Sequence, residues 1–257
     1  MKKEETKFSD SNLLEGMTSI SALLNTPSTV NDRRILTIQI DESKRRSKAA
    51  EIGFLTAKAK ELDFSIEFVS SEIIEQNTVG TSHGGIVAFC TERTFPILEP
   101  KHIEPKGFYV YLEGIEDPYN FGNAIRSLYA AGVIGIVIPP RNWMSAAGVV
   151  ARASAGTSER LQIYISDSDS VVDTFHQVGY RVCCAGIRDS ISVFEAELTY
   201  PLLLVIGGEK RGISRNILNQ SDMILRIDYG REFRGSLSAS SSAAVLAFEI
   251  MRKNLNQ

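Results

Sequence analysis

An asparagine and an arginine lie close together in the segment from Asp117 to Arg126, which directly follows an apolar stretch. Asp117 and Pro118 are a typical start of a helix, because aspartate caps free N–H groups and proline needs no hydrogen bond in the first turn. Asn120 and Arg126 are six residues apart and so do not share a helix face. A turn between them would bring both side chains together at the N-terminal end of the helix, where both would contact a polar substrate. A plain cap and a surface arginine remain the alternative for this segment alone.

A glycine-rich segment, Gly207 to Ser214, follows the apolar run PLLLVI. Its G-x-x-x-x-G spacing is that of a phosphate-binding loop, but Ile213 stands where such a loop needs lysine. The segment is not G-x-G-x-x-G either, so both nucleotide-binding interpretations are disfavoured. What remains is a strand end where backbone can approach a ligand closely, with the carboxylate of Glu209 beside it.

The third segment, Gly235 to Ser242, is rich in serine and opens the last stretch with helical periodicity. Serine is a favoured N-cap, and the free N–H groups at a helix start bind polar ligands. A serine-rich cap with no further role is the alternative. A serine hydrolase is disfavoured, because the chain has no G-x-S-x-G and no histidine after His176.

Strands and helices alternate throughout the second half of the chain, where they would position these three segments. The predicted strands are 108–115, 135–139, 161–165, 181–187, 201–208 and 223–228, and the predicted helices lie around 121–131, 145–155, 169–178, 213–219 and 239–253. Near-continuous apolar strands separated by helices predict a parallel sheet covered on both faces. Ligands of such sheets bind beyond the carboxyl ends of the strands, which is where the first two segments begin.

The first half of the chain predicts a smaller α/β unit. Its expected helices are 14–24 and 45–62, and its expected strands are 35–40, 64–69 and 84–90. Residues 96–107 hold three prolines and a glycine, which is typical of a linker. We therefore expect two domains, residues 1–100 and 106–257.

Composition excludes several classes of protein. The 257 residues are 43% hydrophobic and 23% charged with a net charge of −3, which is typical of a soluble globular protein and argues against a general nucleic-acid coat. No apolar run approaches the roughly 18 residues of a membrane-spanning helix, and the first residues lack a signal-peptide pattern, so the cytoplasm is the expected location. Three cysteines (Cys90, Cys183 and Cys184) without C-x-x-C spacing predict buried packing rather than disulfides or a metal site.

Basic residues gather in three places despite the negative total. These are Lys44, Arg45 and Arg46 with Lys48, then Arg141 with Arg152 and Arg160, and then Arg231 with Arg234. Each group is a candidate for contacts with phosphates, and a solvated surface is the alternative for each.

The order and spacing of the three segments resemble the SpoU/TrmH family of RNA ribose 2′-O-methyltransferases, in the SPOUT superfamily. N-x-x-x-x-x-R from Asn120, G-x-E-x-x-G from Gly207 and S-L-x-x-S from Ser236 look like its three motifs. Further resemblances are the SAGA-like residues 153–156, the H-Q-G-x-x-A-like residues 83–88, and E-G-x-x-S-I-x-x-L-L from Glu15, which looks like the start of the family's substrate-binding domain. Together they cover residues 14 to about 253.

This resemblance implies a C-terminal α/β domain with a parallel sheet and a deep trefoil knot, preceded by a small ribosomal-protein-like α/β domain that binds the substrate. It implies S-adenosylmethionine as the methyl donor, no metal, and a homodimer whose active site spans both subunits. By matching positions, the implied catalytic residues are Asn120, Arg126, Glu209 and Ser236, and the implied donor-binding residues are Gly207, Ile227, Leu237 and Ser238. RNA would be recruited by the first domain, with Lys44, Arg45 and Arg46 as leading contacts, or by Arg141, Arg152 and Arg160.

Two roles are open for Arg126 in such a reaction. Methyl transfer to a ribose hydroxyl requires alignment, removal of the hydroxyl proton and stabilisation of the developing alkoxide. Family proposals make the matching arginine the base, but an arginine with a pKa above about 12 is a poor base. A guanidinium that grips the adjacent phosphate and steadies the alkoxide is the alternative, with Glu209 orienting Arg126 or Asn120.

Two positions depart from the family pattern. Ser238 stands where the third motif usually has asparagine, whose amide reaches further and offers two donors and an acceptor. The loop must then be held in another way, for which the serines 240–242 are candidates, and Gly84 replaces the usual glutamine. The change at Ser238 keeps open a SPOUT-fold RNA-binding protein in which methyl transfer is lost or slow. The extra first domain favours 23S ribosomal RNA over transfer RNA as the target.

Overall fold

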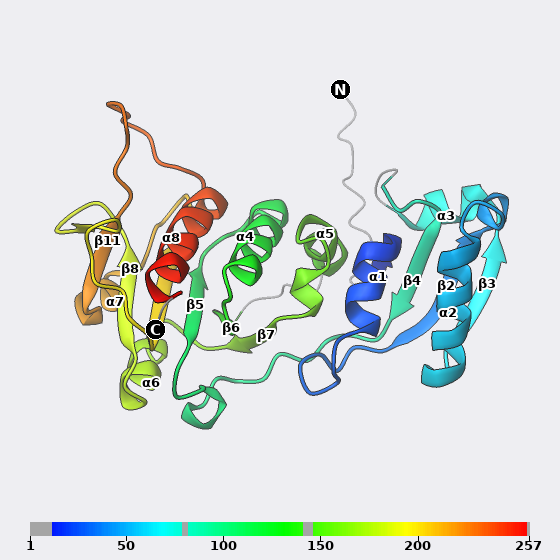
Figure 1. Cartoon of the computed structure of the whole chain (residues 1–257), viewed down its shortest axis with the longest axis horizontal. Coiled ribbons are helices and arrows are strands. Elements are labelled where there is room, and N and C mark those ends of the chain that lie inside the picture. The colour runs from blue at the N-terminus through cyan, green and yellow to red at the C-terminus, as the bar shows by residue number, and fades with distance from the viewer. Residues whose placement is uncertain (1–11, 79–81, 141–145, 256–257) are drawn as a thin grey trace. The chain divides into compact units, whose positions relative to one another are not determined.

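The chain forms two compact units in a computed structural model that describes residues 12–78, 82–140 and 146–255 (Figure 1). The first unit is Met1–Thr94 with Asn142–Arg160, and the second is Phe95–Arg141 with Leu161–Gln257. The chain therefore passes between the units three times. The expected domains, 1–100 and 106–257, divide near the first of these passages, and their limits stay a prediction.

Four strands form the sheet of the first unit. Their order is β1 (Leu13–Glu15), β4 (Ile86–Cys90), β2 (Ile35–Asp41) and β3 (Ser65–Val69). Only the pair β2–β3 is parallel in this sheet of described residues. The expected strands are confirmed with small shifts at their ends, whereas β1 occupies the start of the expected helix 14–24. Its Leu13 and Leu14 are fully buried and pair with β4, so tertiary pairing overrides the helical pattern there.

Helices α1 (Gly16–Leu24), α2 (Ala49–Leu62), α3 (Ser71–Asn77) and α5 (Ala147–Ala153) belong to the first unit. Helix α2 begins four residues later than predicted, because a 3-10 turn over Glu42–Lys44 comes first and the side chain of Asp41 accepts a hydrogen bond from the Ser43 N–H. The short α3 was not predicted. Helix α5, expected with the second half, packs Ala151 into the apolar core of the first unit.

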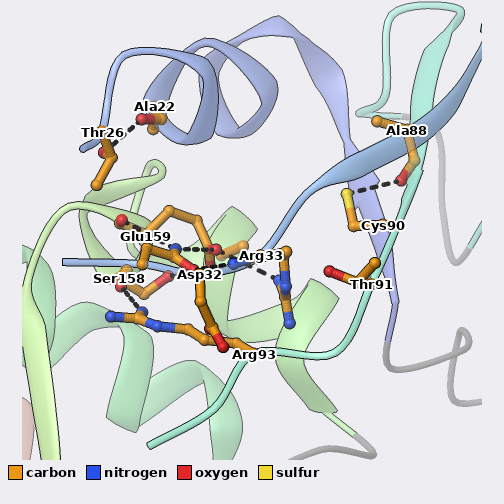
Figure 2. A network of polar contacts seen from close by, with 12 residues as sticks. Ala22, Thr26, Asp32, Arg33, Ala88, Cys90, Thr91, Arg93, Ser158 and Glu159 are labelled. Carbon is orange, nitrogen blue, oxygen red and sulfur yellow. Dashed lines mark hydrogen bonds and ion pairs between the residues drawn. The ribbon is translucent and has the colours of Figure 1, made fainter. Parts of the chain in front are cut away.

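A buried polar network holds the residues after α5 in the first unit, and Figure 2 shows its members. Glu159 Oε2 accepts from Asn31 Nδ2 at 2.9 Å and from Arg33 Nη1 at 3.3 Å. Arg93 donates to the carbonyl oxygens of Ser158, at 2.6 Å, and of Val30, at 3.1 Å. Burial lowers the pKa of Arg93 to about 10, which leaves it protonated at neutral pH. The segment is therefore held by charge and hydrogen bonding as well as by apolar packing.

Glu159→Gln is expected to lower the free energy of unfolding of the first unit by about 3–5 kcal/mol, because the guanidinium of Arg33 would stay buried beside a neutral group. Arg33 and Glu159 are 5% and 4% exposed. The matched control is Glu61→Gln, which removes the carboxylate of a surface ion pair with Lys58 and should leave stability nearly unchanged. Urea unfolding of the full chain, followed by circular dichroism, measures both. Equal midpoints for the two variants would contradict the assigned role of Glu159.

Seven parallel strands form the sheet of the second unit, as predicted. Their order is β7 (Gln162–Ile165), β6 (Gly135–Ile138), β5 (Phe108–Glu113), β10 (Leu202–Gly207), β8 (Arg181–Ala185), β11 (Met223–Arg226) and β9 (Ile191–Ser192). The two-residue β9 was not predicted. The expected trefoil knot stays a prediction.

Helices cover both faces of this sheet. On one face α6 (Val171–Gln177) and α7 (Arg215–Gln220) pack Phe175 and Ile217 against Tyr109 and Tyr111 of β5. On the other, α4 (Pro118–Ala130) packs beside α8 (Ala239–Asn254), which also contacts β10 (Figure 1). Both sets of alternating residues on β5 are buried. Burial on both faces explains why the strands read as continuous apolar runs.

Candidate functional site

The strand order of the second sheet reverses between its central strands β5 and β10. Strands β6 and β7 lie outward from β5, and β8 and β11 lie outward from β10. In an open parallel sheet a ligand crevice forms at such a point, beyond the carboxyl ends of the strands. The first two predicted segments, Asp117 to Arg126 and Gly207 to Ser214, follow these two carboxyl ends.

The backbones after β5 and β10 touch each other directly. The Gly208 N–H donates to the Glu113 carbonyl at 2.6 Å. A Cβ on Gly208 would lie 1.9 Å from the carbonyl oxygen of Gly114, and a Cβ on Gly207 would lie 2.4 Å from the backbone of Gly212. Any larger residue at Gly208 would therefore push the two loops apart. Glycine permits a close approach here between two segments of the protein's own backbone, and the close approach to a ligand stays a prediction.

One carboxylate joins the three predicted segments. Glu209 Oε1 accepts from Asn120 Nδ2 at 2.9 Å and from the Ala239 N–H, at the start of α8, at 3.4 Å. Ser240 Oγ lies 3.5 Å from Asn120 Oδ1. We call Asn120, Glu209, Ala239 and Ser240 the Glu209 junction. It brings residues from positions 120, 209 and 239–240 into one hydrogen-bonded cluster within the second unit.

Both ends of the junction are set by helix caps. Asp117 caps α4 and accepts from the Asn120 N–H at 2.7 Å, which fixes the backbone that carries the Asn120 amide. Ser238 caps α8 by accepting from the Ser241 N–H at 3.2 Å, and its Oγ lies 3.0 Å from the hydroxyls of Ser240 and Ser241. Two of the three serines expected to hold the loop in place of the missing asparagine thus do contact Ser238.

A cleft of about 1000 Å³ opens beside the junction. Its lining includes Glu209 together with four other predicted site residues, namely Gly207, Ile227, Ser236 and Leu237. Tyr229 also lines it, and its hydroxyl accepts from the Leu237 N–H at 3.3 Å, which ties the loop before α8 to the loop after β11. The lining therefore combines apolar side chains and backbone groups with charged side chains, Glu209 among them.

Several lining residues were not predicted, Ile187 and Arg188 after β8 among them. Ile187 is 72% exposed, which is unusual for isoleucine. The rule that ligands bind beyond the carboxyl ends of parallel strands would also have predicted these two residues, since β8 ends at this edge of the sheet.

Not every predicted site residue lies at the cleft. Arg126 is exposed on α4 and is not among the lining residues. Within the described ranges its side chain makes no hydrogen bond or ion pair. Asn120 joins the junction from outside the cleft lining, and Ser238 acts as a cap while its neighbour Ala239 lines the cleft. The roles implied for these residues stay predictions.

The predicted RNA contacts differ in their surroundings. Lys44, Arg45 and Arg46 are exposed just before α2, where the guanidinium of Arg45 lies 3.7 Å from the centre of the Phe68 ring. Arg152 Nη1 donates to Glu15 Oε2 at 2.7 Å, so a carboxylate already occupies part of its donor capacity. Arg160 is exposed, and Arg141 lies outside the described residues.

The three cysteines are buried and free. Burial raises the pKa of each thiol to about 12, so all three stay protonated at neutral pH, in line with the packing role expected for them.

In the described parts of the chain no three His, Cys, Asp or Glu side chains gather as a metal site would require. No helix among those residues is long and apolar enough to cross a bilayer.

Two family models match the chain. The model of the SpoU rRNA Methylase family matches residues 107–248, and a model described as RNA 2′-O ribose methyltransferase substrate binding matches residues 13–96. The chain is 27% identical over 230 residues to a Staphylococcus haemolyticus protein assigned to the TrmH family of tRNA/rRNA methyltransferases, covering 87% of this chain and 90% of that one. A Bacillus subtilis protein with the same assignment is 28% identical over 233 residues, with the same coverage of each chain.

Solved structures share the fold. An AdoMet-bound rRNA methyltransferase from Sinorhizobium meliloti superposes with a TM-score of 0.77 at 20% identity, covering 93% of this chain and 86% of that one. The SpoU methyltransferase AviRb from Streptomyces viridochromogenes, in complex with AdoMet, gives 0.74 at 20% identity, with 93% and 89% covered. The family suggested by the three motifs is thus confirmed by a match to more than half of the sequence, and the chain belongs to the SpoU rRNA Methylase family.

Proposed function

We propose that this protein transfers a methyl group from S-adenosylmethionine to a ribose 2′-hydroxyl of RNA, with large-subunit ribosomal RNA favoured over transfer RNA. The Glu209 junction carries the proposal, because it joins the three motif segments beside one cleft. The family model matched by residues 13–96 supports the ribose hydroxyl as the acceptor. The names of the relatives support RNA as the substrate, and the extra first domain favours the ribosomal target.

The residues at the cleft fit the methyl donor. Ile227 and Leu237 offer apolar contacts to an adenine ring, and Gly207 offers backbone groups without a side chain in the way. Asp228 places a carboxylate at the lining, which suits the cationic sulfonium or ammonium of the donor. S-adenosylmethionine supplies the electrophilic methyl group when bound.

The chain's own residues supply alignment and charge. Asn120 and Glu209 hold the three loops together, and Ser236 is an exposed hydroxyl beside them. No histidine stands in the three segments to act as a base. The guanidinium of Arg126 stabilises the developing negative charge on the ribose oxygen and contacts the adjacent phosphate, because a guanidinium group is a permanent cation with several donors and no acceptor.

A homodimer is part of the proposal, in which Arg126 of one copy acts at the cleft of the other. Arg126 is exposed and is not among the residues that line the cleft of its own chain. Large apolar side chains are also exposed on the two helices that pack together, with Tyr129 on α4 at 37% and Phe248 on α8 at 41%. A second copy lying on α4 and α8 would cover them and bring its own Arg126. A cytoplasmic location is also part of the proposal.

A binding-only protein is the second candidate, and Ser238 is the observation that favours it. The serine hydroxyl is committed to capping α8 and cannot offer the two amide donors of the usual asparagine. This candidate predicts donor and RNA binding with lost or very slow transfer.

Labelled methyl transfer into unmodified total RNA, separated by size, tests the proposal. Label in large-subunit ribosomal RNA is the expected result. Label in transfer RNA instead would overturn the choice of target but keep the enzyme. Donor binding without label in any RNA would favour the binding-only protein, and the absence of donor binding would overturn both.

Replacing Arg45 and Arg46 with glutamate is expected to weaken RNA binding and to flatten its dependence on salt. Each phosphate of a single strand that the protein no longer neutralises lowers the slope of log K against log salt by about 0.7. Lys58→Glu with Lys60→Glu, near the far end of α2, is the control of equal charge change. Filter binding between about 50 and 300 mM salt measures both slopes. An unchanged slope in the Arg45/Arg46 variant would place the RNA-binding surface elsewhere.

A further inference from the structure

The proposed reaction leaves a group of arginines at the cleft without a role. Five line it, namely Arg188, Arg211, Arg215, Arg226 and Arg234. Residues 106–257 hold 12 arginines and 15 carboxylates in all, but only three carboxylates (Asp189, Glu209 and Asp228) are among the lining residues. The half of the chain that carries the cleft is therefore close to neutral as a whole, while its cleft is locally positive.

The arginines divide into two kinds. Arg226 is held in place, since its Nε donates to Asp228 at 2.8 Å and its Nη1 to the Ser190 carbonyl at 2.6 Å. Arg234 lies 3.8 Å from Glu232 in an exposed ion pair. Arg188, Arg211 and Arg215 are exposed and make no hydrogen bond or ion pair within the described ranges. We call these three the arginine rim.

The rim residues come from separate parts of the sheet edge. Arg188 follows β8, Arg211 follows β10, and Arg215 is the first residue of α7. Within the described residues no ion pair or hydrogen bond accounts for these three guanidinium groups. The donor carries a sulfonium and an ammonium beside a single carboxylate, and one guanidinium group can satisfy that carboxylate with two parallel hydrogen bonds. A rim of three guanidinium groups therefore fits an anion with several charges, which arrives with the acceptor.

We propose that the arginine rim binds the RNA backbone at the cleft, with its guanidinium groups on phosphates that flank the target nucleotide. Guanidinium groups match phosphate oxygens with two parallel hydrogen bonds, and their contacts depend on the backbone rather than on base sequence. This inference rests on the proposed function, because it takes the cleft as the place where the ribose is presented. It assigns RNA contacts to the second unit, in addition to those expected for the first.

The test compares the full-length chain with the triple variant Arg188→Ala, Arg211→Ala and Arg215→Ala. The probe is a single-stranded RNA of about 20 nucleotides and mixed sequence, bound over a series of salt concentrations. The triple variant loses its guanidinium contacts to three phosphates. The slope of log K against log salt is therefore expected to fall by about 2, at about 0.7 per phosphate. Replacement of the same three residues with lysine keeps the charge and should restore most of the slope. The triple variant Lys101→Ala, Lys106→Ala and Arg252→Ala is the matched control, since these three exposed cations belong to the second unit and do not line the cleft.

A second measurement separates RNA contacts from donor contacts. Calorimetric titration with S-adenosylmethionine should give the same affinity for the triple variant as for the original chain. A salt slope unchanged in the triple variant, or a chain that does not bind the RNA at all, would overturn the inference. Donor affinity that falls more than tenfold would also overturn it, because the arginines would then hold the donor carboxylate. If the original chain transfers no methyl group but the triple variant still shows a reduced salt slope, the proposed function is rejected and the arginine rim remains an RNA-binding surface.

Discussion

Replacing Arg126 with alanine is expected to reduce methyl transfer by at least about 10²–10³-fold, while affinity for the donor stays within a factor of a few. Arg126 is exposed and outside the cleft of its own chain, so donor binding in one subunit should not depend on it. The developing negative charge on the ribose oxygen does depend on a nearby cation in the proposed mechanism. Single-turnover transfer of labelled methyl and calorimetric titration of the donor measure the two effects. Loss of donor binding with the arginine would contradict this role.

Arg126→Lys is a weak discriminator, because lysine keeps the charge and gives up only the paired guanidinium geometry. Mixing two impaired variants discriminates better. If Arg126 acts on the cleft of a second copy, mixed dimers of Arg126→Ala and Glu209→Ala subunits contain one intact site. Mixing should then restore transfer, whereas a site completed within one subunit would stay inactive after mixing.

Glu209→Ala is expected to weaken donor affinity and to slow methyl transfer, each by about 10–100-fold. The change removes the acceptor of the Asn120 amide and of the Ala239 N–H, and leaving such groups unpaired costs about 1–3 kcal/mol. Glu209 also lines the cleft, so its loss alters the wall as well as the loops. Donor titration and transfer rates, measured on the same preparation, give both quantities.

Glu209→Gln is the conservative control for this positioning residue. Its side-chain oxygen can still accept both hydrogen bonds, so it should recover most of the donor affinity and rate. Because Glu209 is exposed and its partners can bond to water when the chain is free, neither variant should shift the unfolding midpoint by much, and the loss should appear in donor binding and transfer. If glutamine is as damaging as alanine, the negative charge itself is required and the positioning role is wrong.

The second unit was largely predictable because its strands are buried on both faces. Continuous apolar runs such as PLLLVI cannot alternate with solvent, so they predict a parallel sheet and the edge at which its ligand binds. Three short elements, β1, β9 and α3, were missed, because three, two and seven residues carry little periodicity. Helix α2 was predicted to begin too early, since Asp41 stabilises a local turn that no apolar pattern reports.

The contacts that matter most depend on residues far apart in the chain. Asn120 and Glu209 are 89 residues apart. Taken alone, Asn120 is typical of the start of a helix and Glu209 of a charged surface. Similarly, no pattern in the sequence indicates that Glu159 pairs with Arg33, 126 residues earlier, or that helix α5 joins the first unit. Motif order suggested that the three segments work together, but only the folded chain shows that a single carboxylate connects them.

The chemical position of the transferred methyl tests the central claim most directly. RNA methylated by the protein with labelled donor would be digested in alkali, which cleaves the backbone only beside a free 2′-hydroxyl. The account predicts label in alkali-resistant dinucleotides that release 2′-O-methyl nucleosides on enzymatic digestion. Label recovered in alkali-sensitive mononucleotides would place the methyl on a base and contradict the assignment of the ribose hydroxyl as acceptor.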